Sequence, residues 1–313
     1  MKDRFQRDID YLRISVTDLC NLRCFYCMPE EGVDKKTHQD ILRDEEILEA
    51  VKAAVSLGLK KVRITGGEPL VRKGIESLIE KIATTPGIQE VVMTTNGLLL
   101  KGRVKALKAA GISRVNLSLD SLDAATYQKI TGAKKALDYA ALIEELIEEG
   151  MTPIKINAVL LRHINDHEIP DFMALANRYD LEVRFIELMP IGHLSYDYQD
   201  HFISKDECLK RHPELKFDQK HRVAELYHVP GKKGKIGFIN PVSHHFCDAC
   251  NRLRLTADGF LKPCLHTNQE LNIKGLDAKT MKETFTKAIY DKPKQHQLNK
   301  AKPIDRSMNK IGG

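Results

Sequence analysis

Residues 11–27 of this chain, YLRISVTDLCNLRCFYC, decide how the rest of the sequence is interpreted. A short apolar run, YLRISV, passes directly into a loop with the cysteine spacing C-x3-C-x2-C. Three thiols leave a tetrahedral zinc site, or an all-cysteine iron–sulfur cubane, one ligand short. An iron–sulfur cluster held by three cysteines keeps one iron open, which suits a catalytic site. The alternative is a zinc ion completed by a distant residue such as His38.

Helix-like and strand-like patterns alternate after this loop, with one β-then-α unit in about 30 residues. Apolar residues recur at helical spacing in 44–57 and 137–149, and Gly58, Gly111 and Gly150 occupy positions typical of helix C-terminal caps. The expected strands are 61–65, 90–95, 114–119, 154–160 and 182–188. Repeated β-then-α units predict an α/β fold with a parallel sheet, either doubly wound or closed toward a barrel.

Polar and glycine residues gather at the C-terminal ends of three expected strands. They are Gly66-Gly67-Glu68, Thr94-Thr95-Asn96, and the set Asn116, Ser118 and Asp120. Turn and cap chemistry alone explains any one group but not all three together. Parallel α/β folds bind their ligands at this edge of the sheet, so the sequence predicts a ligand site there.

A smaller second region begins after residue 195, where the regular alternation stops. Aromatic and histidine-rich loops and short strand-like runs follow, and RLRLTADGFLKPCL (252–265) predicts a hairpin that turns at Ala-Asp-Gly. We therefore expect two domains: an α/β core at 1–195 and a C-terminal region at 196–313 that ends in a basic tail.

A second cysteine triad lies in this region, at Cys247, Cys250 and Cys264. Its spacing, C-x2-C-x13-C, is ambiguous. It is compatible with another iron–sulfur cluster, and also with a structural zinc completed by a histidine. The candidate histidines are His244, His245 and His266.

Composition limits the cellular compartments and the classes of partner that are compatible with this chain. With 42% hydrophobic and 29% charged residues the chain can bury a substantial core. No run approaches the roughly 18 apolar residues of a membrane span, and the start lacks an apolar signal-peptide core, so we expect a cytoplasmic protein without membrane contact. A reducing compartment argues against a disulfide framework. The net charge of +6 resides in 271–313, and with 6% aromatics and no Trp we expect no nucleic-acid partner.

The cysteine loop CNLRCFYC (20–27) and the strand end TGGEPL (65–70) resemble the signature of the radical S-adenosylmethionine (SAM) enzymes. The resemblance implies that Cys20, Cys24 and Cys27 hold a 4Fe-4S cluster whose open iron chelates the methionine end of SAM. Reductive cleavage of SAM then gives a 5′-deoxyadenosyl radical. Gly66 and Gly67 fit this picture, because absent side chains let the backbone approach the cofactor. The implied SAM contacts are Tyr26, Gly67, Ser118 and Met189.

The stretches FIELMP (185–190) and FCDACNRLRLTADGFLKPCL (246–265), with the Ile-Gly-Gly end, are similar to the GTP 3′,8-cyclase family over nearly the whole chain. The resemblance implies a partial (β/α) barrel whose open edge is closed by the C-terminal region. In that family the second triad holds another 4Fe-4S cluster, whose open iron meets the guanine of GTP. A radical enzyme that modifies peptides with auxiliary clusters is a rival, but such enzymes usually have more than three C-terminal cysteines.

The implied activity is that of a radical SAM lyase in molybdenum cofactor biosynthesis. It removes the ribose 3′ hydrogen of GTP and forms (8S)-3′,8-cyclo-7,8-dihydroguanosine 5′-triphosphate. The implied partners are cyclic pyranopterin monophosphate synthase as the downstream enzyme, a reductant protein such as flavodoxin or ferredoxin, and a second copy in a homodimer.

Cations at strand positions point toward the same expected cavity. Arg252 and Arg254, at i and i+2 of an extended segment, present two guanidinium groups on one face beside the second triad. Two such forks suit a phosphate or carboxylate partner. Family correspondence assigns GTP contacts to Arg13, Arg63, Thr94, Lys155, Arg252, Leu253 and Arg254. Cys208 matches no ligand position.

The last two residues, Gly312 and Gly313, are assigned to the active site by the same resemblance. A Gly-Gly end threads a channel too narrow for other residues, and its carboxylate would add negative charge near Arg13, Arg252 and Arg254. A frayed terminus is the simpler interpretation, and it is what most chains end in.

Overall fold

The structure is a computed structural model that describes residues 1–29, 31–32, 39–191, 198–296 and 304–312. His38 and Gly313 lie outside these ranges. The strands are β1 Tyr11–Ser15, β2 Lys61–Thr65, β3 Glu90–Thr95, β4 Ile112–Ser118, β5 Lys155–Leu160, β6 Glu182–Glu187, β7 Lys216–His221, β8 Ala224–His228, β9 Lys235–Ile239, β10 Arg252–Leu255, β11 Phe260–Lys262 and β12 Leu271–Asn272. The helices are α1 Asp44–Ser56, α2 Ile75–Ala83, α3 Val104–Ala109, α4 Ala124–Thr131, α5 Tyr139–Glu148, α6 Ile169–Tyr179, α7 Tyr198–His201, α8 Lys205–Arg211 and α9 Ala278–Tyr290.

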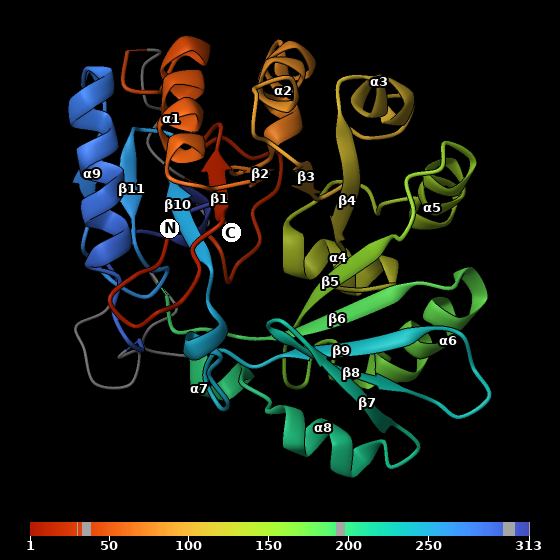
Figure 1. Cartoon of the computed structure of the whole chain (residues 1–313). Helices are drawn as coiled ribbons and strands as arrows, with labels where there is room; N and C mark the ends of the chain where they lie inside the picture. The colour runs from red at the N-terminus through yellow and green to blue at the C-terminus, as the bar shows by residue number, and fades with distance from the viewer. Residues whose placement is uncertain (30, 33–38, 192–197, 297–303, 313) are drawn as a thin grey trace.

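The strands of the described residues form one open, twelve-stranded sheet in the order β12-β11-β10-β1-β2-β3-β4-β5-β6-β9-β8-β7. Neighbours from β10 through to β9 pair in parallel, and the outer strands at both edges pair antiparallel. Figure 1 shows the helices α9, α1, α2, α3, α5 and α6 following one another around the outside of the curved sheet. The expected parallel α/β fold of the partial-barrel type is confirmed.

Alternation along the strands divides the sheet into an apolar outer face and a polar inner face. On β1, Leu12 and Ile14 are fully buried in the main hydrophobic core, whereas Tyr11 and Arg13 line a cavity on the other side. Buried parallel strands are usually apolar on both faces. The cations on every second position therefore make the inner face a candidate site for an anionic ligand.

Most element boundaries agree with the sequence patterns. The bounds of β2 and β3 are those expected, and Gly58, Gly111 and Gly150 have positive φ values of 88°, 106° and 63°. The strand expected at 114–119 runs from Ile112 to Ser118. A register shift in its pairing with β3 inserts one residue near its start and breaks the alternation there, which explains why the sequence pattern misses the first two residues.

The C-terminal region extends the sheet at both of its edges and does not close it into a barrel. Strand β10 adds to β1 on one side, and β9 adds to β6 on the other. The expected hairpin is present as β10 and β11. Residues on both sides of position 195 thus share one sheet, and the two-domain division at that position stays a prediction. No helix within the described ranges has the length and apolar content to cross a lipid bilayer.

Candidate active site

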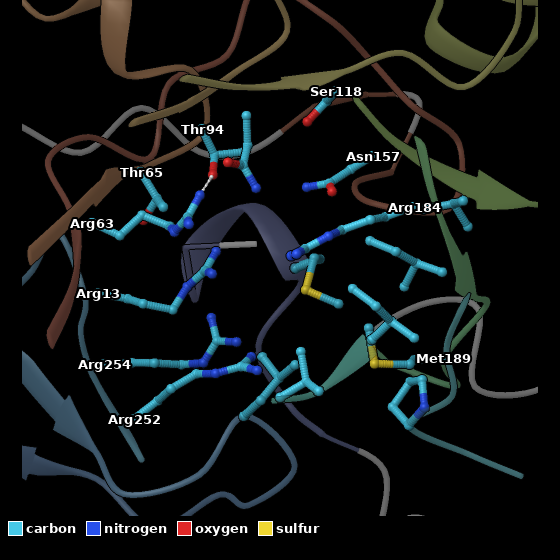
Figure 2. Close-up of a pocket in the computed structure, with 18 of the residues that line it drawn as sticks. Arg13, Arg63, Thr65, Thr94, Ser118, Asn157, Arg184, Met189, Arg252 and Arg254 are labelled. Carbon is cyan, nitrogen blue, oxygen red and sulfur yellow. Dashed lines mark hydrogen bonds between the residues drawn. The ribbon is translucent and has the colours of Figure 1, made fainter. Parts of the chain in front are cut away.

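A cavity of about 620 Å³ occupies the inner face of the sheet, and both cysteine triads line it. Figure 2 shows Arg13, Arg63, Arg252 and Arg254 entering it from one side and Arg184 from the other. Most of the residues expected in the site are brought together here. They are the six cysteines, Tyr26, Gly67, Ser118, Met189, Arg13, Arg63, Thr94, Lys155, Arg252 and Arg254.

Strand register sets three arginines in one row. Arg13 on β1 is the direct partner of Arg63 on β2 and of Arg254 on β10. Because side chains alternate along a strand, all three project from the same face. Burial and the neighbouring Arg254 hold the pKa of Arg13 well below its usual range, while burial and Arg252 lower the pKa of Arg254 to about 10. Such crowded positive charge favours binding of a polyanion.

Arg63 is held in place by two hydroxyl groups. Its Nη1 donates to Oγ1 of Thr94 at 2.8 Å, and its Nε donates to the Tyr11 hydroxyl. Burial opposes ionisation of Tyr11, but the adjacent Arg63 and Arg13 outweigh it and lower the pKa of this phenol to about 8. Thr94 and Arg63, which the resemblance assigns to the same substrate, are therefore in direct contact.

The opposite wall carries a second group of cations. Lys155 Nζ lies 2.5 Å from Oε2 of Glu182, and Arg184 bonds the same carboxylate. Burial and Arg184 lower the pKa of Lys155 to about 8 although Glu182 opposes the shift. Arg184 was not among the site residues predicted from the sequence. Its position on the inner face was predictable, because it lies two residues after Glu182 on a strand whose alternate residues are buried.

Two further cations that sequence reasoning missed, Lys61 and Arg114, line the cavity beside Glu90. Lys61 forms an ion pair with this carboxylate, and Arg114 Nη2 lies 3.1 Å from its Oε1. Each lies two positions before an expected site residue, Lys61 before Arg63 and Arg114 before Asn116. The period-two rule that selected Arg252 and Arg254 would have selected them as well.

The first triad lies on a tight turn braced against α4. Cys27 N donates to Cys24 O at 2.8 Å, and Phe25 N donates to Ile130 O at 3.1 Å. The Tyr26 hydroxyl donates to Oδ2 of the buried Asp120 at 2.6 Å. Burial and the charge of Asp120 hold the pKa of Cys24 well above its usual range. A cationic iron cluster is the partner that would favour these thiolates.

The end of β2 packs directly on this loop. An added Cβ would lie 2.7 Å from Thr17 O at Gly66 and 2.3 Å from Leu19 O at Gly67. The space that the two glycines leave is thus filled by the chain leading into Cys20. This is a different reason for the glycines from the one expected, which was close approach to the cofactor.

Glu68 fixes the next strand end to the same place. It is 1% exposed, and its carboxylate accepts hydrogen bonds from Thr95 Oγ1 at 2.7 Å and from Asn96 N at 2.8 Å. Asn96 Nδ2 in turn donates to Asn21 Oδ1 at 2.8 Å, inside the cysteine loop. The polar strand ends predicted from the sequence therefore hold the first triad in position.

The second triad begins on a short turn at Cys247–Ala249 and ends just after β11. Cys250 N donates to Cys247 O at 3.1 Å. Burial raises the pKa of Cys250, but Lys292 and Arg252 outweigh it and lower this pKa to about 7. The surroundings of the second triad therefore favour the thiolate form of Cys250 before any metal binds.

Both triads are compatible with 4Fe-4S clusters. In each, the charges of the cysteines act on one another's pKa, so the thiols lie close together. Among the described residues no three His, Cys, Asp or Glu side chains converge on a single ion position. A cubane does not require this, since each cysteine binds a different iron.

Of the three histidines considered as zinc ligands, only His266 lines the cavity. Its Nε2 lies 3.1 Å from the Met189 sulfur, and burial and His296 lower its pKa to about 3. His244 and His245 are exposed.

The chain end reaches the arginine row. Gly312 O accepts hydrogen bonds from Arg13 Nη2 at 3.1 Å and from Arg254 Nη1 at 3.0 Å. Just before it, the backbone N–H of Asn309 bonds the Cys27 thiol. The described part of the tail thus contacts both the first triad and the arginines, and a role of Gly312 and Gly313 in the reaction stays a prediction.

Two residues singled out in the sequence do not reach the cavity. The Leu253 side chain is fully buried in the main core, because it alternates with Arg252 and Arg254 on β10. Cys208 is buried on α8, also in the main core.

The sheet, its inner cavity and the loop triad define a radical SAM fold. A family model described as Radical SAM superfamily matches residues 14–176, and one described as Molybdenum Cofactor Synthesis C matches residues 181–298. The structure of Streptococcus suis SuiB bound to S-adenosylmethionine is similar at a TM-score of 0.64 and 17% identity, over 91% of this chain and 66% of that one. Native anSMEcpe with bound AdoMet gives 0.59 and 18%, over 92% and 82%.

Curated relatives narrow this class. The GTP 3′,8-cyclase of Alkaliphilus metalliredigens is 48% identical over 320 residues, and that of Petrotoga mobilis is 45% identical over 327 residues, each covering 100% of both chains. The chain belongs to the GTP 3′,8-cyclase family of radical SAM enzymes.

Proposed function

We propose that this chain converts GTP to (8S)-3′,8-cyclo-7,8-dihydroguanosine 5′-triphosphate, the first step of molybdenum cofactor biosynthesis. The observation that carries the proposal is the row of arginines Arg13, Arg63 and Arg254 in the same cavity that both cysteine triads line. Cys20, Cys24 and Cys27 would hold the cluster that binds SAM, and Cys247, Cys250 and Cys264 would hold the second cluster. Together with SAM, these clusters would supply radical abstraction of a ribose hydrogen.

The triphosphate binds to the arginine row. Arg13, Arg63 and Arg254 offer guanidinium forks that match phosphate oxygens, and the buried setting strengthens each charge-assisted bond. Arg184 faces them across the cavity (Figure 2), and Lys155 shares the Glu182 carboxylate with Arg184, so both cations bind the same polyanion from the other wall. Held at this end, the nucleoside would lie in the cavity that both cysteine triads line.

Exclusion of water falls to the C-terminal tail and the loop after β6. Ile191, Ile304 and Ile311 are buried together, and Met189 and Met308 pack against them. A radical that met solvent or stray side chains would be lost, so this apolar cluster protects the reaction.

The remaining assignments are proposals of the same kind. We assign the SAM contacts to Tyr26, Gly67, Ser118 and Met189, with Asp120 orienting the Tyr26 hydroxyl. A flavodoxin or ferredoxin supplies the electron, cyclic pyranopterin monophosphate synthase takes the product, and the chain forms a homodimer. A cytoplasmic location is proposed because two cysteine triads need a reducing compartment.

The test is an anaerobic incubation of purified protein with dithionite, SAM and each nucleoside triphosphate in turn. We expect brown protein with about eight irons per chain and a cyclised product from GTP alone. Colourless protein with stoichiometric zinc, or product from every nucleotide, would contradict the proposal. Arg63→Ala is the matched control, because it removes one of the phosphate forks while its own hydrogen bonds go to Tyr11 and Thr94 and not to a cysteine.

A further inference from the structure

Lys292 is a buried lysine immediately behind the second triad. It follows the end of α9 and is only 2% exposed. Its Nζ donates to Arg252 O at 2.9 Å, to Pro263 O at 2.5 Å, and to the Cys250 thiol. An ammonium has three donors, and each of them has an acceptor here.

The positions of these acceptors connect the two arms of the triad. Arg252 is two residues after Cys250, and Pro263 directly precedes Cys264. Strands β10 and β11 separate these arms along the chain. One ammonium group therefore fixes the spacing between the two cysteines.

The charge of Lys292 is balanced differently from that of the other buried cations nearby. Lys262 has a fully buried side chain and pairs with Glu270 at 2.8 Å, and Arg7 pairs with Asp3 at 2.6 Å. No ion pair between described residues includes Lys292, and its two carbonyl partners are neutral. Burying an ammonium is costly unless an anion accompanies it, and the sulfur of Cys250 is the group that can carry that charge.

We propose that Lys292 is a positioning residue for the second cluster, holding the Cys250 and Cys264 arms together and placing a positive charge on a ligand sulfur. The proposal deepens the proposed function, since it rests on the second triad holding a cluster. A hydrogen bond and a positive charge at a cluster sulfur stabilise the reduced state, so Lys292 raises the reduction potential of this cluster.

The experiment measures the potential of the second cluster by itself. In full-length protein with Cys20, Cys24 and Cys27 replaced by Ala, the remaining iron signal belongs to the second triad. Lys292→Met, which keeps the length and removes the charge, is compared with Lys292→Arg. The matched control is Lys262→Met, because it removes another buried lysine, on the hairpin against which Lys292 packs.

We expect about four irons per chain in each protein and a more negative midpoint potential in Lys292→Met alone, by anaerobic redox titration followed by electron paramagnetic resonance. Loss of the cluster in Lys292→Met alone would also support the proposal, since the Arg variant and the Lys262 variant would then show that the fold still accepts iron.

An unchanged potential in fully loaded Lys292→Met would overturn the inference. Equal loss of iron in Lys292→Met and Lys262→Met would overturn it too, because a general packing defect would then explain both. Failure of the proposed function would appear differently, as a second triad that binds no iron even when Lys292 is intact.

Discussion

Gly312→Ala is the sharpest perturbation of the chain end. Gly312 has a φ of +76°, and an added Cβ would lie 2.7 Å from Thr65 Oγ1 and 3.2 Å from Ser15 Cβ. Thr65 cannot easily give way, because its hydroxyl donates to Ile14 O at 3.0 Å and its side chain is buried. The methyl group would therefore push the tail off Arg13.

The size of the effect follows from two contributions. A left-handed backbone costs a residue with a Cβ about 1–2 kcal/mol, and overpacking a tight contact costs about 1–3 kcal/mol. Together they weaken docking of the tail by about 30-fold to several thousand-fold, at tenfold per ~1.4 kcal/mol. Undocking removes the carbonyl that bridges Arg13 and Arg254 and opens the cavity to water.

The assay is anaerobic turnover of GTP beside an iron determination. We expect Gly312→Ala to bind both clusters and to lose most of its conversion, as should removal of Gly312 and Gly313 or a C-terminal tag. Gly102→Ala is the control, because Gly102 has the same φ of +76° with no atom within 4 Å of the added Cβ. Wild-type turnover by loaded Gly312→Ala would refute the reasoning.

Further predictions concern the two clusters and the charges around GTP. Cys24→Ala should abolish SAM cleavage, whereas Cys264→Ala should leave cleavage partly intact and abolish cyclisation; equal loss of cleavage in both folded variants, measured as 5′-deoxyadenosine, would contradict separate roles. Arg63→Ala should weaken GTP binding by about 10- to 150-fold in equilibrium titrations, the loss of one charge-assisted contact; full-strength binding would remove it from the site. The pKa of Lys155 is lowered to about 8, so this amine is charged below pH 8 and neutral above it. GTP affinity should therefore fall from pH 7 to pH 9, and fall less in Lys155→Arg; a flat profile would exclude Lys155 from phosphate binding.

The cysteine spacings and the alternating cations made much of the site predictable. Arg252 and Arg254 stand two apart on a strand, and such local periodicity determines which face a side chain takes. It also explains the exception, Leu253, whose side chain is turned into the core by the same alternation. The spacing did not reveal which carboxylate pairs with each cation. Glu182 pairs with Lys155, and Glu90 with Arg114, across neighbouring strands.

Features that depend on tertiary packing could not be predicted from the sequence. The register shift near the start of β4, in its pairing with β3, is not revealed by local alternation. The close packing of Gly66 and Gly67 against Thr17 and Leu19 depends on how the cysteine loop folds back, which the sequence pattern does not reveal. Lys292 lies in a basic tail that reads as a solvated end, and only packing against the hairpin buries it.

The most direct measurement of the central claim follows one hydrogen atom. GTP deuterated at the ribose 3′ carbon is incubated anaerobically with the reduced enzyme and SAM, and 5′-deoxyadenosine is analysed by mass spectrometry. If the enzyme abstracts the ribose 3′ hydrogen, deuterium from GTP appears in 5′-deoxyadenosine together with formation of the cyclised triphosphate. Deuterium that stays in the nucleotide while 5′-deoxyadenosine is released would contradict it.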